Sequence, residues 1–262
     1  MNARPAYTDF RRRLTAHEHV LGTFIKTPTT HATEILGMLG FDFVIIDQEH
    51  APFDRGAIDV MVLAARASNI AGIVRVGDPS DANILSVLDC GATGIMVPHV
   101  DSAAKAREVA AACRYKGGKR GFANTTRAGR FGELSFAEHM AAQDAQVTCI
   151  AMIEDLAALD HIEAIANVDG IDAFFIGRGD LTAAIEAPSM TSAETHRLVA
   201  PIMATARQAG MPVMMLCPDR NDAMAMAKLG ASAFVVASDH GFLKQAAKQA
   251  LAEFAPPITG AS

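Results

Sequence analysis

Four short apolar segments of this chain share one pattern. Each begins with a glycine that follows a helical stretch, and each continues into residues that are mainly β-branched or aromatic. A glycine just past a helix fits a left-handed cap, and a short apolar run fits a strand that is buried on both faces. The segments are Gly40–Asp47, Gly91–Pro98, Gly170–Gly177 and Gly230–Ala237, and the helical stretches before them are Thr30–Leu39, Ser80–Cys90, Leu156–Asn167 and Asp222–Leu229.

Four further apolar β segments lie between these repeats. The repeats start roughly 50 to 80 residues apart, which suits a unit of two strands and two helices. Eight strands that alternate with helices are the signature of a (β/α)₈ TIM barrel, which right-handed crossovers would close. We therefore predict a single TIM-barrel domain over residues 1–262, with its core at about 15–254. The intervening segments are Val20–Ile25, Ala71–Val76, Val147–Ile153 and Pro212–Leu216.

A doubly wound sheet is the alternative arrangement of such elements. It usually contains a glycine-rich phosphate turn, and the run Gly177–Asp180 begins like one but lacks the third glycine. Tyr115–Phe131 is polar and rich in Gly and Arg, so we expect a loop over the mouth of the barrel. The tail Ala255–Ser262 contains Pro-Pro and is expected to be frayed. The helix predicted before it, Phe242–Phe254, is expected to pack against a neighbouring subunit.

Composition restricts the cellular setting and the partners. Half of the residues are hydrophobic, and the net charge of −6 comes from interspersed charges of both signs, which argues against nucleic acid as a partner. No apolar run approaches the length of a membrane span, and the first residues carry no apolar signal region. We expect a soluble cytoplasmic protein whose cysteines are reduced and mostly buried. The four cysteines, none in a C-x-x-C pair, are Cys90, Cys113, Cys149 and Cys217.

Polar residues that follow the predicted strands are the candidates for an active site, because a TIM barrel forms its site at the carboxyl ends of the strands. Glu154 follows the fifth strand and Asp180 follows the sixth, so their side chains can converge. Two carboxylates with open coordination positions suit Mg²⁺ or Mn²⁺, completed by water and substrate oxygens. Alternatively, each carboxylate simply caps the next helix. The other candidates are Asp47, Glu49, His50, Arg75, Asp155 and Arg178, whereas His99, Cys217, Ser238 and Asp239 offer little.

Two of these candidates suggest proton transfer and anion binding. His50 follows the second strand, and histidine is the commonest general base, although a loop histidine can also be bonded to backbone. Arg75 ends a very apolar strand, where a cation is costly unless it meets an anion. That anion would be a substrate carboxylate, a developing enolate, or the side chain of Asp47 or Glu49.

Several motifs together resemble the HpcH/HpaI aldolase family, within the citrate lyase-like barrel superfamily. The most specific part of the resemblance joins the string Glu49–Pro52 to the later Glu154 and to Gly177 and Asp180-Leu. The family consists of metal-dependent class II aldolases that cleave 2-keto-3-deoxy sugar acids and related 4-hydroxy-2-oxo acids. The resemblance covers most of the chain and includes Gly40-Phe-Asp, Ile46-Asp47, Arg75, Leu88-Asp89, Val97-Pro98, Arg114-Tyr115, Arg120-Gly121 and Val168–Asp172.

The resemblance implies a role for each candidate. Glu154 and Asp180 would ligate a divalent cation, Mg²⁺ or Mn²⁺, with Co²⁺ as a further candidate. His50 would be the general base that removes the proton of the C4 hydroxyl, directly or through a water. Arg75 would stabilise the pyruvate enolate, and Asp89 would raise the basicity of His50.

The resemblance also implies that the backbone at Gly179 and Asp180 would hold the pyruvyl carboxylate. Further substrate contacts are expected at positions where this chain departs from the family pattern. Met152 stands where the family usually has a Gln two residues before the metal ligand, so an amide is lost. Gln48 stands where the family usually has a Gly, and it would return that amide from another strand.

Arg178 is the third departure, because the family usually has Gly-Pro-Ala/Ser-Asp where this chain has Gly177–Asp180. This places a cation beside the metal site. Arg178 is expected to bind a second acidic group on the substrate, or to pair with Glu49 or Asp155. Substrate preference is therefore expected to differ from the usual pattern.

The leading functional hypothesis is an aldolase that releases pyruvate, or a close 2-oxo acid, and an aldehyde from a 4-hydroxy-2-oxo acid. A metal that is chelated by the ketone and carboxylate oxygens needs no Schiff-base lysine, and Lys26 after the first strand is the nearest candidate for one. A lyase of the citrate lyase β/malyl-CoA lyase type that acts on a CoA thioester is the alternative. A non-catalytic barrel that binds metal and oxo acid is the second alternative. The resemblance also implies a homo-oligomer, a hexamer or trimer, assembled through C-terminal helices.

Overall fold

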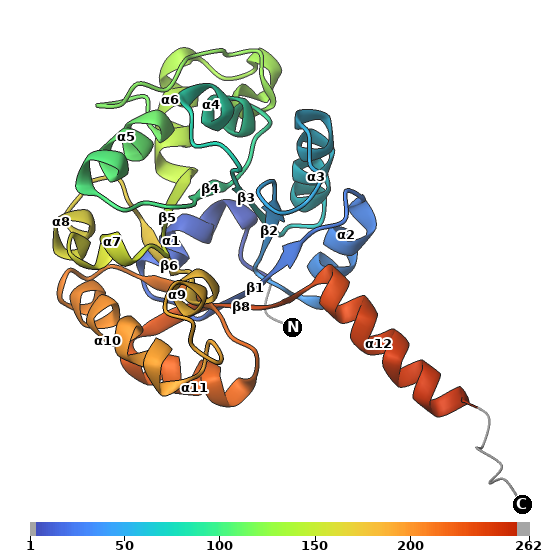
Figure 1. Ribbon diagram of the computed structural model, residues 1–262. Helices are drawn as coiled ribbons and strands as arrows, with labels where there is room; N and C mark the ends of the chain where they lie inside the picture. Colours follow the sequence, from blue (N-terminus) through green and yellow to red (C-terminus); the bar gives the residue numbers. More distant parts are fainter. Residues whose placement is uncertain (1–3, 256–262) are drawn as a thin grey trace, which may run out of the picture.

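Eight parallel strands form a closed barrel in this computed structural model, which describes residues 4–255 (Figure 1). Each strand pairs with its neighbours in chain order, and β8 closes the barrel by pairing with β1. The predicted (β/α)₈ barrel is therefore confirmed, and every strand lies inside the segment that predicted it, except that β8 extends one residue beyond, to Ser238. The strands are β1 Val20–Ile25, β2 Phe43–Asp47, β3 Ala71–Arg75, β4 Gly94–Val97, β5 Thr148–Ile153, β6 Ala173–Ile176, β7 Val213–Leu216 and β8 Ala231–Ser238.

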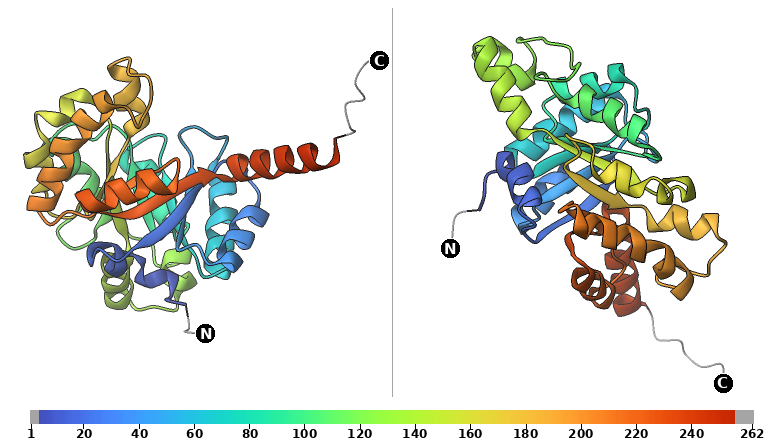
Figure 2. Two further views of the ribbon diagram at one scale, coloured as in Figure 1. Left: turned by 90° about the horizontal axis from the view of Figure 1, so that it is seen from below. Right: turned by 90° about the vertical axis from the view of Figure 1, so that its left-hand side faces the viewer.

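Helices surround the barrel and connect its strands (Figures 1 and 2). The glycines after α2 and α11 adopt the predicted left-handed caps, with φ of 100° at Gly40 and 113° at Gly230. The helix predicted at Leu156–Asn167 is divided into α7 and α8. The helices are α1 Phe10–Thr15, α2 Thr30–Leu39, α3 Arg55–Ala67, α4 Asp81–Asp89, α5 Ala103–Cys113, α6 Phe136–Gln146, α7 Leu156–Leu159, α8 Ile162–Ala166, α9 Arg178–Ala184, α10 Ala193–Gln208, α11 Arg220–Leu229 and α12 Asp239–Phe254, with 3₁₀ turns η1 Tyr7–Asp9 and η2 Arg127–Gly132.

Side chains along each strand alternate between the barrel interior and the layer under the helices. On β2, Phe43 and Ile45 belong to the interior cluster, and Val44 and Ile46 pack outward. The interior remains apolar until the last inward position before the mouth, where several strands place a charged side chain. Each of these charged residues comes two positions after an interior residue of the same strand. They are Lys26 after Phe24, Asp47 after Ile45, Arg75 after Ile73 and Glu154 after Met152.

Helix α1 closes the barrel at the amino ends of the strands. Phe10 and Leu14 are buried in the interior cluster, and the ring of Phe10 lies 5.2 Å from that of Phe43, centroid to centroid. An ion pair of 2.7 Å between Arg13 and Asp42 fixes α1 beside the start of β2. The carboxyl ends of the strands are therefore the open mouth, where the charged side chains stand.

The loop expected over the mouth lies elsewhere, so that prediction is wrong. Tyr115–Phe131 connects α5 to α6 on the way to the start of β5, and it packs against α3 and α4. Arg120 approaches Asp89 at the end of α4, at 3.7 Å, and Arg127 pairs with Asp59 of α3 at 2.7 Å. A connection from a helix to the next strand returns to the amino ends of the strands, away from the mouth.

Helix α12 extends away from the barrel (Figures 1 and 2). It begins at Asp239, earlier than predicted, because Ser238 caps it by accepting a hydrogen bond of 3.1 Å from the N–H of Gly241. None of its residues is buried, and Leu243, Leu251 and Phe254 are 72%, 73% and 84% exposed. The tail beyond it, 256–262, which was expected to be frayed, lies outside the described residues.

The structure also tests what the sequence predicted about the cysteines and about membrane-spanning helices. All four cysteines are free and buried, whereas the sequence predicted burial for most of them. Within residues 4–255, no helix combines the length and apolar character that a membrane crossing requires.

Candidate active site

Asp47 is the centre of a buried ion cluster at the mouth. Its side chain is fully buried at the end of β2, where Arg75 donates to Oδ1 from Nε at 2.9 Å and Lys26 Nζ lies 2.7 Å from Oδ2. The backbone N–H of His50 also donates to Oδ1, at 3.1 Å. Burial opposes ionisation, but Lys26, Arg75 and the His50 N–H hold the pKa of Asp47 below its ordinary value.

Arg75 joins Asp47 to a second carboxylate. Its Nη1 lies 3.2 Å from Oε2 of Glu49, and its guanidinium carbon lies 4.9 Å from the ring centroid of Phe24. Both pairings that the sequence suggested for Arg75 therefore occur together. The guanidinium is fixed on two sides by carboxylates and rests on an aromatic ring, so its orientation is well defined.

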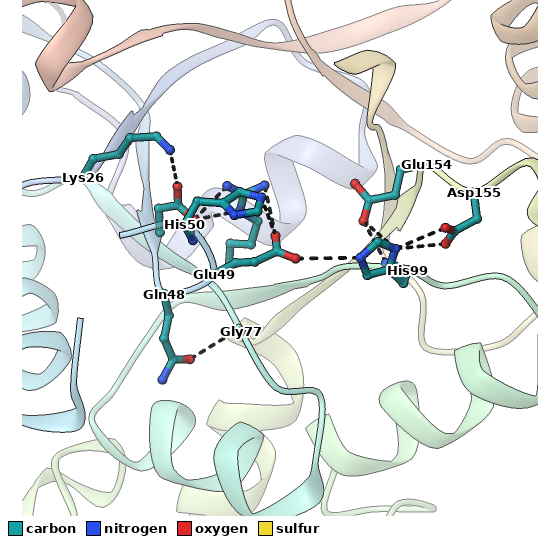
Figure 3. A network of polar contacts seen from close by, with 10 residues as sticks. Lys26, Gln48, Glu49, His50, Gly77, His99, Glu154 and Asp155 are labelled. Carbon is teal, nitrogen blue, oxygen red and sulfur yellow. Dashed lines mark hydrogen bonds and ion pairs between the residues drawn. The ribbon is translucent and has the colours of Figure 1, made fainter. Parts of the chain in front are cut away.

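His50 stands at the surface of this cluster. Its side chain is 59% exposed, and Nε2 lies 3.7 Å from Oε2 of Glu49 (Figure 3). The backbone of His50 is fixed by Asp47, whereas its ring remains accessible from the mouth. This placement suits a group that exchanges a proton with a substrate or a water.

Glu154 follows β5 on another side of the mouth. It is 4% exposed, and the backbone N–H of His99 donates to Oε1 at 2.9 Å. Gly177 leaves room for it, because a Cβ at that position would lie 2.5 Å from the Cβ of Glu154. Burial raises the pKa of Glu154 to about 7, against the hydrogen bond from His99, and the charge of Asp180 adds to the increase.

Glu154 and Asp180 form a donor set that fits a hard divalent cation. Asp180 lies in the first turn of α9, directly after the neighbouring strand β6, and it is exposed. Burial, and to a smaller extent the charge of Asp180, favours the protonated form of Glu154, and a cation between the two carboxylates would stabilise the ionised form. No cluster of three or more His, Cys, Asp or Glu side chains with metal-binding geometry occurs within residues 4–255. A cation held by two carboxylates would take its remaining ligands from water and substrate oxygens.

His99 is a site residue that sequence reasoning undervalued. Its Nδ1 lies 3.1 Å from Asp155 Oδ2 and 3.5 Å from Glu154 Oε1, and Nε2 lies 3.9 Å from Glu49 Oε1 (Figure 3). Burial lowers the pKa of His99, but these three carboxylates raise it above its ordinary value overall. The signal in the sequence was its position two residues after β4, at the mouth of the barrel.

Gln48 and Met152 do not come together as expected. The side chain of Gln48 accepts hydrogen bonds from the Gly77 N–H at 3.4 Å and from Asn83 Nδ2 at 3.1 Å, and it points away from His50 in Figure 3. Met152 is buried on β5 and lines the cavity at the mouth. Gln48 is engaged with the connection after β3, so it does not return an amide to the place of Met152.

Arg178 has a partner that sequence reasoning did not identify. Its Nη1 and Nη2 lie 2.9 and 2.5 Å from the two carboxylate oxygens of Asp222, and Nη2 also donates to the carbonyl oxygen of Leu216 at 2.6 Å. The expected pairing with Glu49 or Asp155 is wrong, because α9 starts with this side chain directed toward β7 and α11. Its side chain is 1% exposed and its charge is neutralised, which argues against binding of a second acidic group by Arg178.

Asp89 is not beside His50 in the described part of the chain. It is the last residue of α4, and its carboxylate approaches Arg120 Nη2 at 3.7 Å. Burial raises the pKa of Asp89. Helix α4 begins just after the mouth, at its cap Ser80, and Asp89 lies at the opposite end. An action of Asp89 on His50 within one chain is therefore not supported.

A cavity of about 360 Å³ opens at the mouth beside these groups. Its polar lining includes Lys26, Arg75 and Asp180, and its apolar lining includes Met152 and Phe175. A larger cavity of about 810 Å³ lies far from the mouth, along α5 and the connection before β6. The smaller cavity lies at the carboxyl ends of the strands, where a TIM barrel forms its active site, so it is the candidate active site.

Comparison with known proteins places these residues in context. The sequence pattern of the family described as HpcH/HpaI aldolase/citrate lyase matches residues 21–246. A 5-keto-4-deoxy-D-glucarate aldolase from Klebsiella pneumoniae subsp. pneumoniae is 31% identical over 242 residues, which cover 92% of this chain and 94% of that protein.

Solved structures are similar over nearly the same length. An aldolase/citrate lyase family protein from Burkholderia cenocepacia J2315 superposes with a TM-score of 0.88 at 28% identity, covering 94% of this chain and 98% of that one. The citrate synthase SbnG superposes with a TM-score of 0.83 at 27% identity, covering 93% and 96%. The family match, residues 21–246, extends from the second residue of β1 to the first half of α12.

Proposed function

Because the chain belongs to the HpcH/HpaI aldolase/citrate lyase family, we propose that it is a divalent-metal-dependent aldolase that cleaves a 4-hydroxy-2-oxo acid. The products would be pyruvate, or a close 2-oxo acid, and an aldehyde. The observation that carries the proposal is the pair Glu154 and Asp180 at adjacent strand ends, in one mouth with Arg75 and His50. The family and the lyase class that the sequence predicted are confirmed by the relatives.

Glu154 and Asp180 would hold the cation, with Mg²⁺ or Mn²⁺ preferred and Co²⁺ as a further candidate, because both ligands are hard carboxylate oxygens. When bound, the cation supplies a Lewis acid and a template for the ketone and carboxylate oxygens of the substrate. The backbone at Gly179 and Asp180 would hold the pyruvyl carboxylate. The apolar wall that includes Met152 would exclude water around it.

His50 would accept the proton of the C4 hydroxyl, directly or through a water, as the bond between C3 and C4 breaks. The electron pair of that bond passes to the pyruvyl fragment and forms its enolate. Arg75, held between Asp47 and Glu49, presents a fixed positive charge toward the developing anion. A proton that returns to C3 then yields pyruvate, and no oxidant or reductant is needed.

The test of this function measures pyruvate release. The protein is treated with EDTA, reloaded with Mg²⁺, Mn²⁺ or Co²⁺, and given a panel of 4-hydroxy-2-oxo acids with a coupled lactate dehydrogenase. We expect activity that EDTA abolishes and cation restores. His50→Ala is expected to lower kcat by about 10²- to 10⁴-fold, the contribution of a general base. His161→Ala, which changes an exposed histidine between α7 and α8, is the matched control and is expected to keep activity.

Other outcomes separate the alternatives. Activity that survives EDTA would refute the metal mechanism, and full activity in His50→Ala would refute the assigned base. Turnover of a malyl-CoA thioester without turnover of any oxo acid would favour the CoA-thioester lyase. Metal-dependent binding of an oxo acid without turnover of either class would favour the non-catalytic barrel.

We also propose a homo-oligomer, a hexamer or trimer, in which α12 docks on a second copy of the chain. The apolar side chains Leu243 and Leu251 of α12 are exposed, and so are Met38 and Leu39 of α2, at 85% and 73%. Sedimentation is expected to give a mass three or six times that of the 27.6 kDa chain. Leu243→Asp with Leu251→Asp is expected to lower that mass, and a monomeric wild-type protein would contradict the proposal.

A further inference from the structure

A cavity of about 190 Å³ lies away from the mouth, among segments that lead into the strands. Its walls include the last turn of α3 before β3, Gly91 before β4 and the end of α6 before β5, with η1 beside them. Segments that lead into strands return to the amino ends of the barrel, opposite the mouth. We call this cavity the arginine chamber, because Arg66, Arg127 and Arg130 line it.

Gly91 allows two of these arginines to come together. A Cβ at this position would lie 2.7 Å from Arg66 Nη1 and 3.2 Å from Arg127 Cδ, so both side chains pack against the space that glycine leaves free. Gly91 also has a left-handed backbone, with a φ of 88°, which glycine adopts most readily. Two positive side chains that pack against the same point repel each other, and an anion between them would relieve that repulsion.

The arginines have unused hydrogen-bond donors. Arg127 pairs with Asp59 at 2.7 Å through Nη2, but its Nε is buried and has no hydrogen-bond partner within the described residues. Neither Arg66 nor Arg130 forms an ion pair with a carboxylate in the part of the chain that the structure describes, 4–255. A buried donor without a partner is costly, and an oxygen atom of a ligand would satisfy it.

The acidic residue of the lining does not neutralise the chamber. Glu138 accepts the N–H of Ser135 at 2.9 Å and its hydroxyl at 2.6 Å, as part of the capping box of α6. These hydrogen bonds hold the pKa of Glu138 below its ordinary value, so this carboxylate is ionised. One carboxylate therefore stands against three guanidinium groups in the described lining, and the chamber keeps a net positive charge.

The turn that carries Arg130 is conformationally costly. Arg130 and Phe131 follow each other in the left-handed region, with φ of 51° and 56°. Residues other than glycine persist there only where the surrounding structure fixes them, and such residues are enriched at sites that bind ligands. Thr8 and Gln146 also line the chamber, and their side chains carry further hydrogen-bond donors.

We propose that the arginine chamber binds a phosphate-type anion, as free phosphate or as the phosphate group of a small ester. The planar fork of a guanidinium matches two oxygens of a phosphate, and the charge of phosphate complements the excess positive charge. The site is separate from the mouth, because the cavity at the mouth shares no lining residue with it. The inference therefore goes beyond the proposed aldolase reaction and does not depend on it.

The experiment measures phosphate binding by titration calorimetry. The full-length protein is treated with EDTA and titrated at low, constant ionic strength as the wild-type protein, Arg66→Met and Arg130→Met. Arg207→Met, which changes an exposed arginine in the last turn of α10, is the control that removes the same charge. We expect each chamber variant to increase the Kd about tenfold or more and Arg207→Met less than about threefold. Arg130 is exposed, so its replacement is expected to leave the fold intact.

Further outcomes separate the chamber from other sources of binding. Arg75→Met tests the mouth, and a Kd that increases in this variant but in neither chamber variant would overturn the proposal. Equal increases in Arg207→Met and the chamber variants would also overturn it, because only net charge would then matter. Absence of phosphate binding by the wild-type protein would do the same. Glycerol 3-phosphate identifies the source: a lower Kd than that of phosphate, lost in Arg66→Met, indicates an ester, and a similar or higher Kd indicates free phosphate.

Chemical modification locates the bound anion. Phenylglyoxal, which reacts with accessible guanidinium groups, is applied with and without phosphate, and the modified peptides are identified by mass spectrometry. With phosphate at about ten times its Kd, we expect modification of Arg130 to slow about tenfold, and modification of Arg207 to be unchanged. Equal rates at Arg130 with and without phosphate would refute binding in the chamber.

Discussion

Replacing Glu154 with glutamine is expected to reduce pyruvate release by about 10³-fold and to weaken Mn²⁺ binding by at least about 100-fold. Glutamine has nearly the same shape, so it fits beside Gly177 and accepts the N–H of His99, but it lacks the negative charge that a cation requires. Activity is measured by the coupled assay at saturating Mn²⁺, and affinity by calorimetry. Far-ultraviolet circular dichroism verifies that the variant is folded.

The matched control is the neighbouring carboxylate. Asp155 lies next in the chain and contacts His99 at 3.1 Å, but its side chain is 36% exposed. Asp155→Asn is expected to change Mn²⁺ affinity by less than about tenfold, because an exposed pair contributes little. Equal losses of Mn²⁺ affinity in the two variants would mean that the overall negative charge at the mouth, rather than ligation by Glu154, determines how tightly the cation binds.

The same substitution has a consequence for stability in the metal-free protein. Glu154 has its pKa raised from 4.5 to about 7, so the folded state binds this proton more tightly than the unfolded state. The stabilisation is fully present below about pH 4.5 and is lost as the pH rises through about 7, by up to about 3 kcal/mol. Urea unfolding at several pH values is expected to show a steeper loss of stability between about pH 4.5 and 7 in the wild-type protein than in Glu154→Gln. Parallel profiles would contradict it.

The fold could be predicted because its signals are local. The glycine caps at Gly40 and Gly230, and the apolar runs after them, depend on backbone geometry and burial, which neighbouring residues determine. The charged residues at the mouth could also be predicted, since Asp47 and Arg75 end apolar runs and Glu154 directly follows one. Lys26 carried the same signal, two residues beyond the inward-facing Phe24, and its contact with Asp47 follows from that alternation.

The contacts that sequence reasoning did not find depend on side-chain direction at turns. His99 contacts Glu154 and Asp155 with its backbone at a φ of 54°, and the neighbouring residues in the sequence do not predict this backbone angle. Arg178 pairs with Asp222, which lies 44 positions later in the chain, because β7 and α11 pack beside α9. The position of Tyr115–Phe131 was predictable in principle, since every helix-to-strand connection of a barrel returns to the closed end.

Replacing Arg75 with methionine is expected to lower both stability and activity, and the two effects have different origins. Arg75 donates to Asp47 at 2.9 and 2.8 Å, and Asp47 is fully buried. Its loss leaves this carboxylate with Lys26 and the His50 N–H alone, which is expected to cost about 3–5 kcal/mol of unfolding free energy. Activity is expected to fall by about 10³-fold, because the fixed charge toward the enolate is also removed.

A second variant separates these effects. Asp47→Asn in the Arg75→Met background removes the uncompensated charge, so urea unfolding is expected to recover most of the lost free energy. Pyruvate release is expected to remain about 10³-fold below that of the wild-type protein, since no substitute for the guanidinium faces the substrate. Recovery of activity together with stability would instead show that Arg75 serves only to hold Asp47. If Arg75→Met is as stable as the wild-type protein, Lys26 and the His50 N–H suffice to stabilise Asp47, and the fold does not require the charge of Arg75.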